Sequence, residues 1–357
     1  MGAKSDPLSS RGARTNATGR YEKDARVYFD DGWADRDPVP PKIETIVARE
    51  AARTIISRND SPDVSFDQSI NTYRGCEHGC IYCYARPNHA YVGLSPGVDF
   101  ESRIFVKAEA ARLLEKELAA PRYKPRTIVL GGVTDIYQPA EREHRVTRAV
   151  LEVLQRHAHP FGMITKSALV LRDLDIIAPM AANNLAKVAI SLTTLDRTLA
   201  RVMEPRAAAP HRRLETIRDL SAAGVPVTVM TAPIIPAIHD KEIEALLEAG
   251  AGAGAREAGY VVLRLPLEIA DLFREWLEAH FPDRAAHVMS LVRSMRHGRD
   301  YESAWGLRQK GDGPYAHLIA ARFRRACAKL GLNATRRELD TSQFRRPPRS
   351  GDQLTLF

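Results

Sequence analysis

The chain has 357 residues, of which 44% are apolar, a formal net charge of +8 and four cysteines. This length suits one large catalytic domain with appendages or two domains. The sequence has no run of about 18 apolar residues that would indicate a membrane span, and no apolar stretch after the first charges that would indicate a signal peptide. The low number of cysteines is typical of a protein of the reducing cytoplasm, which we expect here.

Residues 1–60 are expected to form an amino-terminal extension. The start is rich in Ser, Gly, Arg, Asn and Thr, which is typical of a disordered tail. Four aromatic residues follow, and we expect them to pack on the main domain as a strap: Tyr21, Tyr28, Phe29 and Trp33. A short helix or an extended lead-in is predicted between Ile43 and Ile56.

Short β-branched runs alternate with amphipathic stretches over residues 61–270. The predicted strands are Gln68–Tyr73, Arg103–Val106, Thr127–Leu130, Gly162–Thr165, Lys187–Leu192, Val225–Met230 and Tyr260–Leu265. The predicted helices are Ala108–Ala119, Arg142–His157, Leu171–Asn183, Pro210–Ala223 and Lys241–Ala249. Pro210 suits a first helical turn and Gly224 a helix end.

This alternation predicts parallel β/α units with right-handed crossovers. We therefore expect an α/β fold, a partial (β/α)6-type TIM-like barrel with an N-terminal strap and a basic helical C-terminal extension. In such a barrel the ligands gather at the carboxyl ends of the strands.

Three cysteines lie in one short loop directly after the first predicted strand. Cys76, Cys80 and Cys83 are accompanied by Gly75 and Gly79, which let the backbone turn around an inorganic group. Disulfides are a poor explanation, because three cysteines cannot all pair and the fourth is far away in a predicted helix. The loop therefore predicts a metal or iron–sulfur site.

The number of thiolates indicates the chemistry. A four-iron, four-sulfur cluster on three thiolates keeps one iron free for a small molecule with an amine and a carboxylate, such as S-adenosylmethionine. An electron passed to its sulfonium releases a 5′-deoxyadenosyl radical. The alternative is a structural zinc site with His78 or His89 as the fourth ligand, although zinc motifs usually bring two separated pairs of ligands.

The spacing of the three cysteines, with Tyr82 before the last of them, resembles the radical S-adenosylmethionine (SAM) superfamily. Members often carry a glycine-rich segment whose backbone receives the methionyl amino group, and Gly131-Gly132 resembles it, with Thr134 and Asp135 able to replace the usual acidic contact. A strand-to-helix turn that needs glycine for its conformation alone is the alternative.

Later strand ends offer further candidates for cofactor binding. Lys166 could pair with the carboxylate of the cofactor. Ser191 closes a predicted strand at the height where the ribose hydroxyls would lie. Glu204 and Arg206 could hold each other or the cofactor. Each of these residues has the alternative of being an ordinary surface polar residue or a helix cap.

Several segments together resemble the branch related to spore photoproduct lyase, often labelled DNA repair photolyase. They are Asn71–Cys76, Cys80–Tyr84, Thr134–Gln138, Ile164–Lys166 and Ala232–Pro236. The resemblance implies that Tyr82 and Tyr84 help in cofactor packing and radical return, and that Thr134, Lys166 and Ser191 bind the cofactor. Those lyases place a hydrogen-donating cysteine where this chain has Gly132.

Residues 271–340 are expected to form a basic helical extension. Between residues 284 and 349 there are 15 Lys and Arg against 5 Asp and Glu, so the positive charge of the chain is concentrated here. The cations that could neutralise phosphates are Arg322, Arg324, Arg325, Lys329, Arg336, Arg337, Arg345, Arg346 and Arg349. The interleaved aromatic residues are Tyr301, Trp305, Tyr315 and Phe323. A solvated helix face with buried aromatics is the alternative.

Residues 341–357 are expected to be a flexible tail with a short linear motif. Its end resembles the peptide by which bacterial polymerases and repair proteins hold the sliding clamp, with Gln353 for hydrogen bonding and Leu354, Leu356 and Phe357 as apolar anchors. A tail that folds back onto the body is the alternative.

The sequence as a whole predicts a radical SAM enzyme with a 4Fe–4S cluster that acts on DNA in a repair lyase-like reaction. Its expected partners are nucleic acid, the clamp and an electron donor such as flavodoxin or ferredoxin. The same chemistry on RNA, a protein or a small metabolite is one alternative. A zinc-dependent module that binds nucleic acid or a partner is the other.

Overall fold

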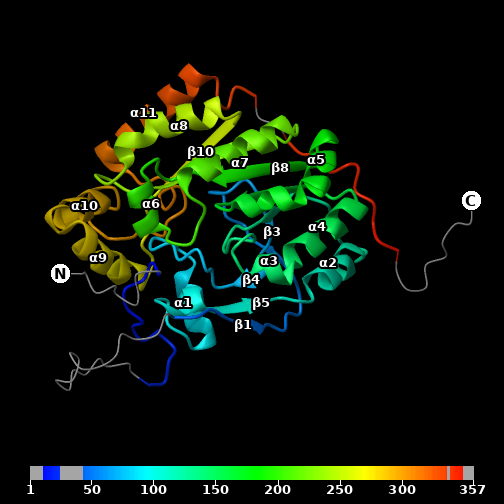
Figure 1. Ribbon diagram of the computed structural model, residues 1–357, viewed down its shortest axis with the longest axis horizontal. Helices are drawn as coiled ribbons and strands as arrows, with labels where there is room; N and C mark the ends of the chain where they lie inside the picture. Colours follow the sequence, from blue (N-terminus) through cyan, green and yellow to red (C-terminus); the bar gives the residue numbers. More distant parts are fainter. Residues whose placement is uncertain (1–10, 25–42, 336–337, 349–357) are drawn as a thin grey trace, which may run out of the picture.

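The computed structural model describes residues 11–24, 43–335 and 338–348 (Figure 1). The strands are β1 (Ile46–Arg49), β2 (Ile56–Arg58), β3 (Gln68–Ile70), β4 (Tyr73–Arg74), β5 (Arg103–Val106), β6 (Ile128–Leu130), β7 (Phe161–Thr165), β8 (Ala186–Ser191), β9 (Val227–Ile234) and β10 (Glu257–Val262).

The α-helices are α1 (Asp99–Ser102), α2 (Ala110–Leu118), α3 (Glu141–His144), α4 (Val146–Arg156), α5 (Leu174–Ala182), α6 (Arg197–Met203), α7 (Pro210–Ala222), α8 (Ile243–Gly252), α9 (Ile269–His280), α10 (Pro282–Ser294) and α11 (Gly313–Leu330). Short 3-10 helices are η1 (Arg86–Val92), η2 (Ala168–Asp173) and η3 (Asp240–Glu242). Among the described residues, no helix is long and apolar enough to cross a membrane.

A seven-stranded sheet carries the site, with the strand order β10-β9-β8-β7-β6-β3-β2. In this sheet β3, β6, β7, β8, β9 and β10 pair in parallel, and β2 runs antiparallel to β3 at the edge. In the described part of the chain no strand pairing joins β10 to the opposite edge, so the barrel is open. The predicted α/β fold with a partial barrel is confirmed.

One predicted barrel strand takes a different place. The strand Arg103–Val106, expected in the parallel series, is β5, which pairs with β1 and β4 in a separate three-stranded sheet. Its burial alternates along the strand, and so does that of the barrel strands β6 and β9, so the burial pattern alone does not separate the two sheets. A run of four residues does not reveal its partners, which are β1 before the β/α series and β4, which begins at the last residue of the predicted strand Gln68–Tyr73.

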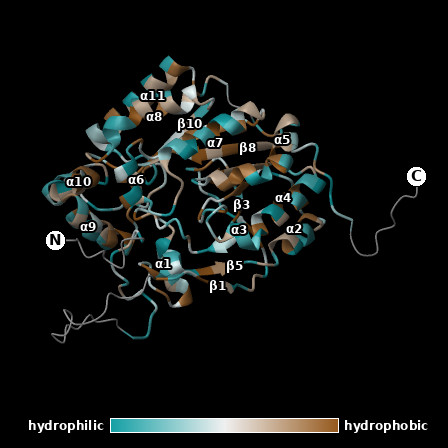
Figure 2. Ribbon diagram, viewed as in Figure 1, coloured by the Kyte–Doolittle hydropathy of each residue, from teal (hydrophilic) through white to brown (hydrophobic). Residues whose placement is uncertain are grey.

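The helices that cover the sheet are amphipathic. Helix α4, for example, buries Val146, Val150, Leu151 and Leu154, which share one face at helical spacing and belong to the main core. Figure 2 shows the contrast between apolar strands such as β8 and β5 and the more hydrophilic helix surfaces. Helix α7 begins at Pro210, and Gly224 just beyond its end has φ of 77°, as the sequence predicts.

The last helix packs on the main core. Helix α11 lies beside α8 (Figure 1), and the ring of Phe323 lies 4.5 Å from that of Tyr260. Cys327 is buried on the same face. Phe323 and the partly buried Tyr315, which bonds Asp240, are therefore not the stacking surfaces that the sequence predicts, because the apolar face of α11 needs them for its own burial.

The segment that follows α11 crosses the amino ends of the barrel strands. Asp340 N–H donates to the carbonyl of Asn184 before β8, and Arg345 N–H donates to that of His157 before β7. Arg346 donates to the carbonyl of Tyr123 before β6, at 3.1 Å. The expected flexible tail is therefore wrong for residues 341–348, and Gln353 to Phe357 lie outside the described residues.

The other terminus lies against the cysteine loop. Ala13 and Arg11 are buried, and the N–H groups of Gly12 and Ala13 donate to the carboxylate of Glu101 at 2.8 Å. The expected disordered tail is wrong for this segment, because its backbone satisfies a buried carboxylate. Of the four strap aromatics, Tyr21 stacks on Tyr91 at 5.5 Å, and the other three lie outside the described residues.

Residues 301–312, which we call the wall segment, span the open side of the barrel. The carbonyl of Gln309 accepts from Val262 N–H at 2.8 Å, at the end of β10. Arg308 and the N–H of Gly306 both bond Asp63, in the loop before β3, at 2.5 and 2.6 Å. The wall segment thus connects the β10 edge of the sheet with the loop between β2 and β3 at the other edge.

Candidate functional site

The three cysteines lie on a tightly held loop between β4 and η1. The thiols of Cys76, Cys80 and Cys83 are free, and the first two are buried. Cys76 N–H donates to Phe100 at 2.9 Å, and Ile81 N–H donates to Met203 at 3.0 Å. The loop is therefore fixed on both sides by other parts of the chain.

Gly79 is required by the shape of this loop. It has φ of 66°, and a Cβ at this position would lie 2.6 Å from a carboxylate oxygen of Glu101. A side chain would meet both a strained backbone and a buried charge. The expectation that glycine lets the loop turn is confirmed here.

Arg86 organises the loop from inside. Its side chain is 0% exposed and donates to the carbonyls of Gly79 and Cys80 at 3.1 and 3.0 Å. It also donates to the carbonyls of Pro96 and Gly97. An ion pair with Glu101 at 2.5 Å completes its contacts. This buried charge is fully satisfied, as such a group must be to avoid a large desolvation cost.

Asp135 connects the cysteine loop to the sheet. One carboxylate oxygen accepts from the hydroxyl of Thr165 at 2.7 Å, and the other accepts from Lys166 N–H at 2.8 Å. The second oxygen also lies 3.3 Å from Nδ1 of His78. Burial raises the pKa of Asp135, but His78 and these hydrogen bonds outweigh it and hold the pKa below its usual value. The carboxylate is thus already occupied.

A second buried network surrounds Glu204. Its carboxylate bonds the hydroxyls of Tyr82 and Thr193 and pairs with Arg213. Burial raises the pKa of Glu204, but Arg213 and Lys166 lower it to about 2. Tyr82, which stands between two cysteines, is thereby tied to α6 and α7.

The ammonium group of Lys166 lies beside these networks. Nζ is 5.8 Å from the ring centre of Tyr82 and makes no hydrogen bond to any described residue. Burial lowers the pKa of Lys166, but Cys80 and Glu204 raise it by more, so the pKa lies above its usual value and the group carries its charge. An incoming carboxylate would find here a positioned cation.

The turn after β6 is held by backbone contacts. Gly131 has φ of 82°, and a Cβ there would lie 2.5 Å from the carbonyl of Ile164. Thr134 uses its hydroxyl on the carbonyl of Tyr73, at 2.8 Å. The hydroxyl of Tyr84 bonds the carbonyl of Gly132. The conformational role of the first glycine is clear, and the hydroxyl of Thr134 is already engaged.

The remaining candidates are less close to the cysteines or have other partners. Arg206 pairs with Glu77 at 2.9 Å, so it and Glu204 do not hold each other. Ser191 donates weakly to the carbonyl of Ala232 at 3.4 Å. Arg206 still contacts the cysteine loop, because Glu77 belongs to it.

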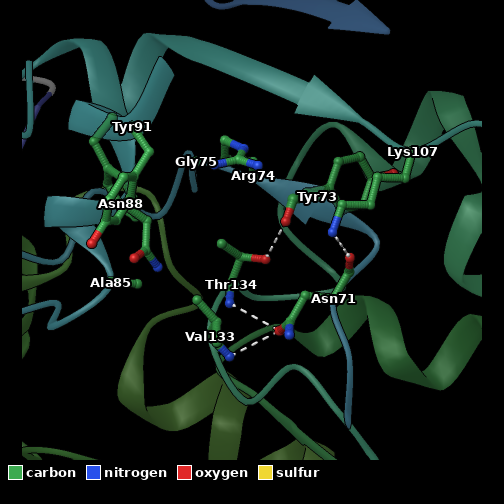
Figure 3. Close-up of a pocket in the computed structure, with 11 residues that line it drawn as sticks. Asn71, Tyr73, Arg74, Gly75, Ala85, Asn88, Tyr91, Lys107, Val133 and Thr134 are labelled. Carbon is green, nitrogen blue, oxygen red and sulfur yellow. Dashed lines mark hydrogen bonds between the residues drawn. The ribbon is translucent and has the colours of Figure 1, made fainter. Parts of the chain in front are cut away.

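A cavity of about 150 Å³ borders the cysteine loop (Figure 3). Gly75, Ala85 and Phe100 line it on the loop side, and Ala85 and Phe100 also pack with Cys76. Asn71 lies on the other side and accepts hydrogen bonds from the backbone of Val133 and Thr134, as Figure 3 shows. This pocket reaches within one layer of side chains of the thiols.

The buried thiols need a positively charged partner to become thiolates. Burial raises the pKa of Cys76 well above its usual value, and Asp135 and the other two thiols raise it further, so a positive partner is needed to keep them as thiolates. Within the described ranges, no three His, Cys, Asp or Glu side chains are grouped to hold a single metal ion. His78 faces Asp135, and His89 bonds the carbonyl of Arg103 at 2.9 Å. Both histidines have other partners, and the three thiols on one loop fit the three protein ligands of a cluster.

Comparison with known proteins identifies the family. Residues 70–250 match the model of the radical SAM superfamily. The chain belongs to the radical SAM superfamily. Members of this superfamily use a 4Fe–4S cluster and SAM, in agreement with the three thiols and the cofactors that the sequence predicts.

Two curated relatives and one solved structure show how far the similarity extends. An uncharacterised protein of Mycobacterium tuberculosis is 35% identical over 230 residues, which are 64% of this chain and 68% of the relative. One of Methanocaldococcus jannaschii is 27% identical over 173 residues, 48% of this chain and 62% of the relative. A spore photoproduct lyase structure aligns with a TM-score of 0.55 and 17% identity over 80% of each chain. The resemblance to that branch of radical SAM proteins is therefore confirmed at the level of fold.

Several residues that hold the radical SAM site are not apparent from its motifs. They are Arg86, Glu101, Arg213 and Glu77. Arg86 and Glu101 are 15 residues apart, and only their complementary charge hints at a pair. Arg213 lies in the middle of a charged helical run, where nothing distinguishes it from its exposed neighbours.

Proposed function

We propose that this radical SAM protein holds a 4Fe–4S cluster with Cys76, Cys80 and Cys83 and acts on DNA in a lyase-like reaction. The observation that carries the proposal is the position of the thiols. They lie on a loop at the carboxyl ends of the strands, near the ammonium group of Lys166, which is 5.8 Å from the ring centre of Tyr82, and next to a cavity. When bound, the cluster and SAM supply an electron and a 5′-deoxyadenosyl radical.

The residues of this chain would bind and orient the cofactor. Lys166 offers its unbonded ammonium group to the carboxylate of SAM, and the backbone of Gly131 and Gly132 offers a close approach to its amino group. Tyr82 and Tyr84 form the aromatic sides of the site. Ser191 and Thr134 remain proposed cofactor contacts.

Three charged candidates are proposed as positioning residues. The carboxylates of Asp135 and Glu204 are occupied by the chain itself, so they orient Lys166 and Tyr82 respectively. Arg206 holds Glu77 of the cysteine loop. These roles place them around the cofactor without requiring direct contact.

DNA as the substrate is supported by two observations. A structural neighbour, spore photoproduct lyase, has been solved with a dinucleoside spore photoproduct bound. The carboxy-terminal part is strongly basic, and Arg324, Arg325 and Lys329 are exposed on α11. A base within a duplex would have to be flipped out to reach the site.

The reaction differs from cleavage of the thymine dimer that the resemblance suggests. Gly132 stands at the position of the hydrogen-donating cysteine, and the cysteine outside the loop, Cys327, is buried on α11. We therefore propose radical chemistry on another DNA lesion. RNA, a protein or a small metabolite are the alternative substrates.

Two partners belong to this proposal. A flavodoxin or ferredoxin would supply the electron, and the tail residues Gln353, Leu354, Leu356 and Phe357 would bind the sliding clamp. The clamp proposal rests on the sequence of the tail alone.

The replacement Cys80→Ala tests the cluster assignment. After anaerobic reconstitution with iron and sulfide, we expect the variant to lose the cluster and to form no 5′-deoxyadenosine from SAM under reduction, because one of three ligands is missing. Iron content and chromatography of the nucleoside are the measurements.

Cys327→Ala is the matched control, because it removes a buried thiol outside the loop. It should keep wild-type iron content. A Cys80→Ala protein that retained its full iron would overturn the assignment, and a wild-type protein that bound zinc in place of iron would favour the binding-module alternative.

A further inference from the structure

Arginine side chains gather where the wall segment meets the cysteine loop. Arg264 follows β10, Arg296 follows α10, and Arg308 belongs to the wall segment. Arg296 is fully buried and donates to the carbonyls of Leu263 and Leu307, at 2.9 and 2.5 Å. It therefore joins the end of β10 to the wall and holds both in place.

Arg264 lies directly beside the proposed radical site. Its guanidinium carbon is 4.8 Å from the ring centre of Tyr84, the residue after Cys83. The hydroxyl of Tyr84 is fixed on Gly132 at the end of β6. A weak contact of 3.5 Å links Arg264 to the hydroxyl of Tyr301 in the wall segment. Two aromatic residues thus orient this guanidinium.

The positive charge of Arg264 has no carboxylate partner among the described residues, and its Nε is buried without an acceptor. The nearby carboxylate of Asp63 is already bonded by Arg308 and by Gly306 N–H. Glu302 lies against Arg299, at 3.8 Å. A half-buried guanidinium with a buried, unbonded Nε and no counter-charge is costly, unless an anion from outside completes the site.

We infer that Arg264 binds a backbone phosphate of a nucleic-acid strand and so positions the substrate beside Tyr84. The inference rests on the proposed function and names a contact for its substrate. A guanidinium is suited to a phosphate, because its planar fork can donate two parallel hydrogen bonds. The exposed ring of Trp305, 57% accessible in the same wall segment, offers a stacking surface for a base.

The first test measures binding of a short, fluorescently labelled single-stranded oligothymidylate by anisotropy at several salt concentrations. We expect R264Q to bind about ten- to a hundred-fold more weakly, as for loss of a hydrogen bond to a charged group. The slope of log K against log salt should also fall by about 0.7, the value for one phosphate contact on a single strand.

Two further variants keep the result interpretable. R264K keeps the charge, so it should keep the salt slope while binding more weakly because it lacks the planar fork. R218Q removes an exposed arginine of α7, away from the proposed contact, and should bind like the wild type. If R264K lost the slope as completely as R264Q, or if R264Q bound like the wild type, the assignment would be wrong.

A single neutral methylphosphonate at successive linkages locates the contact. We expect one linkage to weaken binding by the wild-type protein and to have no further effect on R264Q. If no linkage is coupled to Arg264, or if an acidic peptide binds in its place with the same dependence on Arg264, the phosphate assignment is wrong.

The proposed radical chemistry is read separately from this binding. Formation of 5′-deoxyadenosine by the wild-type protein is measured without the oligonucleotide. The absence of 5′-deoxyadenosine would count against the proposed function. Oligonucleotide binding that depends on both Arg264 and one phosphate linkage would still support the phosphate contact. If 5′-deoxyadenosine formed but no phosphate linkage depended on Arg264, the phosphate contact would be wrong and the proposed function would stand.

Discussion

The two ends of the parallel sheet use different kinds of buried polar group. At the carboxyl ends, charged pairs such as Arg86–Glu101 and Arg213–Glu204 are buried around the cysteine loop. At the amino ends the polar group is a cluster without an ion pair, in which the hydroxyl of Tyr123 lies 2.7 Å from Nε2 of His159. Buried charges are costly to desolvate, so their concentration at one end marks the end that handles a charged cofactor.

Each end is also covered by a different terminus of the chain. Residues 11–13 donate to Glu101 beside the cysteine loop, whereas residues 338–348 cross the amino ends of β8, β7 and β6. Phe344 packs its ring 5.2 Å from that of His159. The two termini therefore stabilise opposite ends, and the comparison predicts different responses to mutation and to pH.

The largest effect is expected at the carboxyl ends. Arg86→Met should lower the free energy of unfolding by about 3–5 kcal/mol, because Glu101 would remain buried without its partner. Arg322→Met is the matched control: its pair with Glu244 is partly exposed, and its loss should cost about 0–1 kcal/mol. Urea unfolding measures both. Equal shifts of the two midpoints would show that the charges at the cysteine loop are not special.

The amino ends should respond to pH. Burial lowers the pKa of His159 to about 4, against an unfolded value of about 6.5. Below pH 6.5 the unfolded chain binds a proton that the folded protein does not. The stability from His159 is thus fully present above pH 6.5 and is lost as the pH falls towards 4, by about 3 kcal/mol.

His159→Gln isolates this contribution. Burial also lowers the pKa values of His89 and His239. Both proteins contain these two histidines, so their contribution to the pH dependence cancels when the wild type and the variant are compared. We expect the difference in unfolding free energy between the two proteins to shrink between pH 6.5 and 4. A constant difference over this range would mean that His159 is not buried as a neutral ring.

The sequence predicts which candidate residues lie close together where its signals are local. Cys76, Cys80 and Cys83 stand within one loop, and the β/α alternation places Lys166 and Asp135 at neighbouring strand ends, where Lys166 N–H indeed donates to Asp135. The parallel order of strands also follows from the alternation, because a helix between two strands requires a crossover.

The sequence fails where distant residues decide. The pairing of β5 with β1 and the partner of Arg213 depend on contacts between separated segments, and no periodicity encodes them. The two covering segments are residues 11–13 and 338–348. Their backbone groups make the hydrogen bonds that hold them, so their side chains show only the composition of a disordered segment. Composition identifies segments that lack a core of their own, but not those that dock on another core.

The smallest effect on the body of the protein is expected from removing residues 353–357. The chain passes residue 348 at the amino ends of the strands, away from the cysteine loop at the carboxyl ends. Deletion should therefore leave the urea midpoint and the 5′-deoxyadenosine yield unchanged, while it abolishes capture by an immobilised sliding clamp. Replacing Leu356 and Phe357 with Ala in the full-length chain should have the same effect, because they are the proposed apolar anchors. Unchanged capture by either protein would remove the clamp proposal, and a lower nucleoside yield would mean that the two ends of the sheet are not independent.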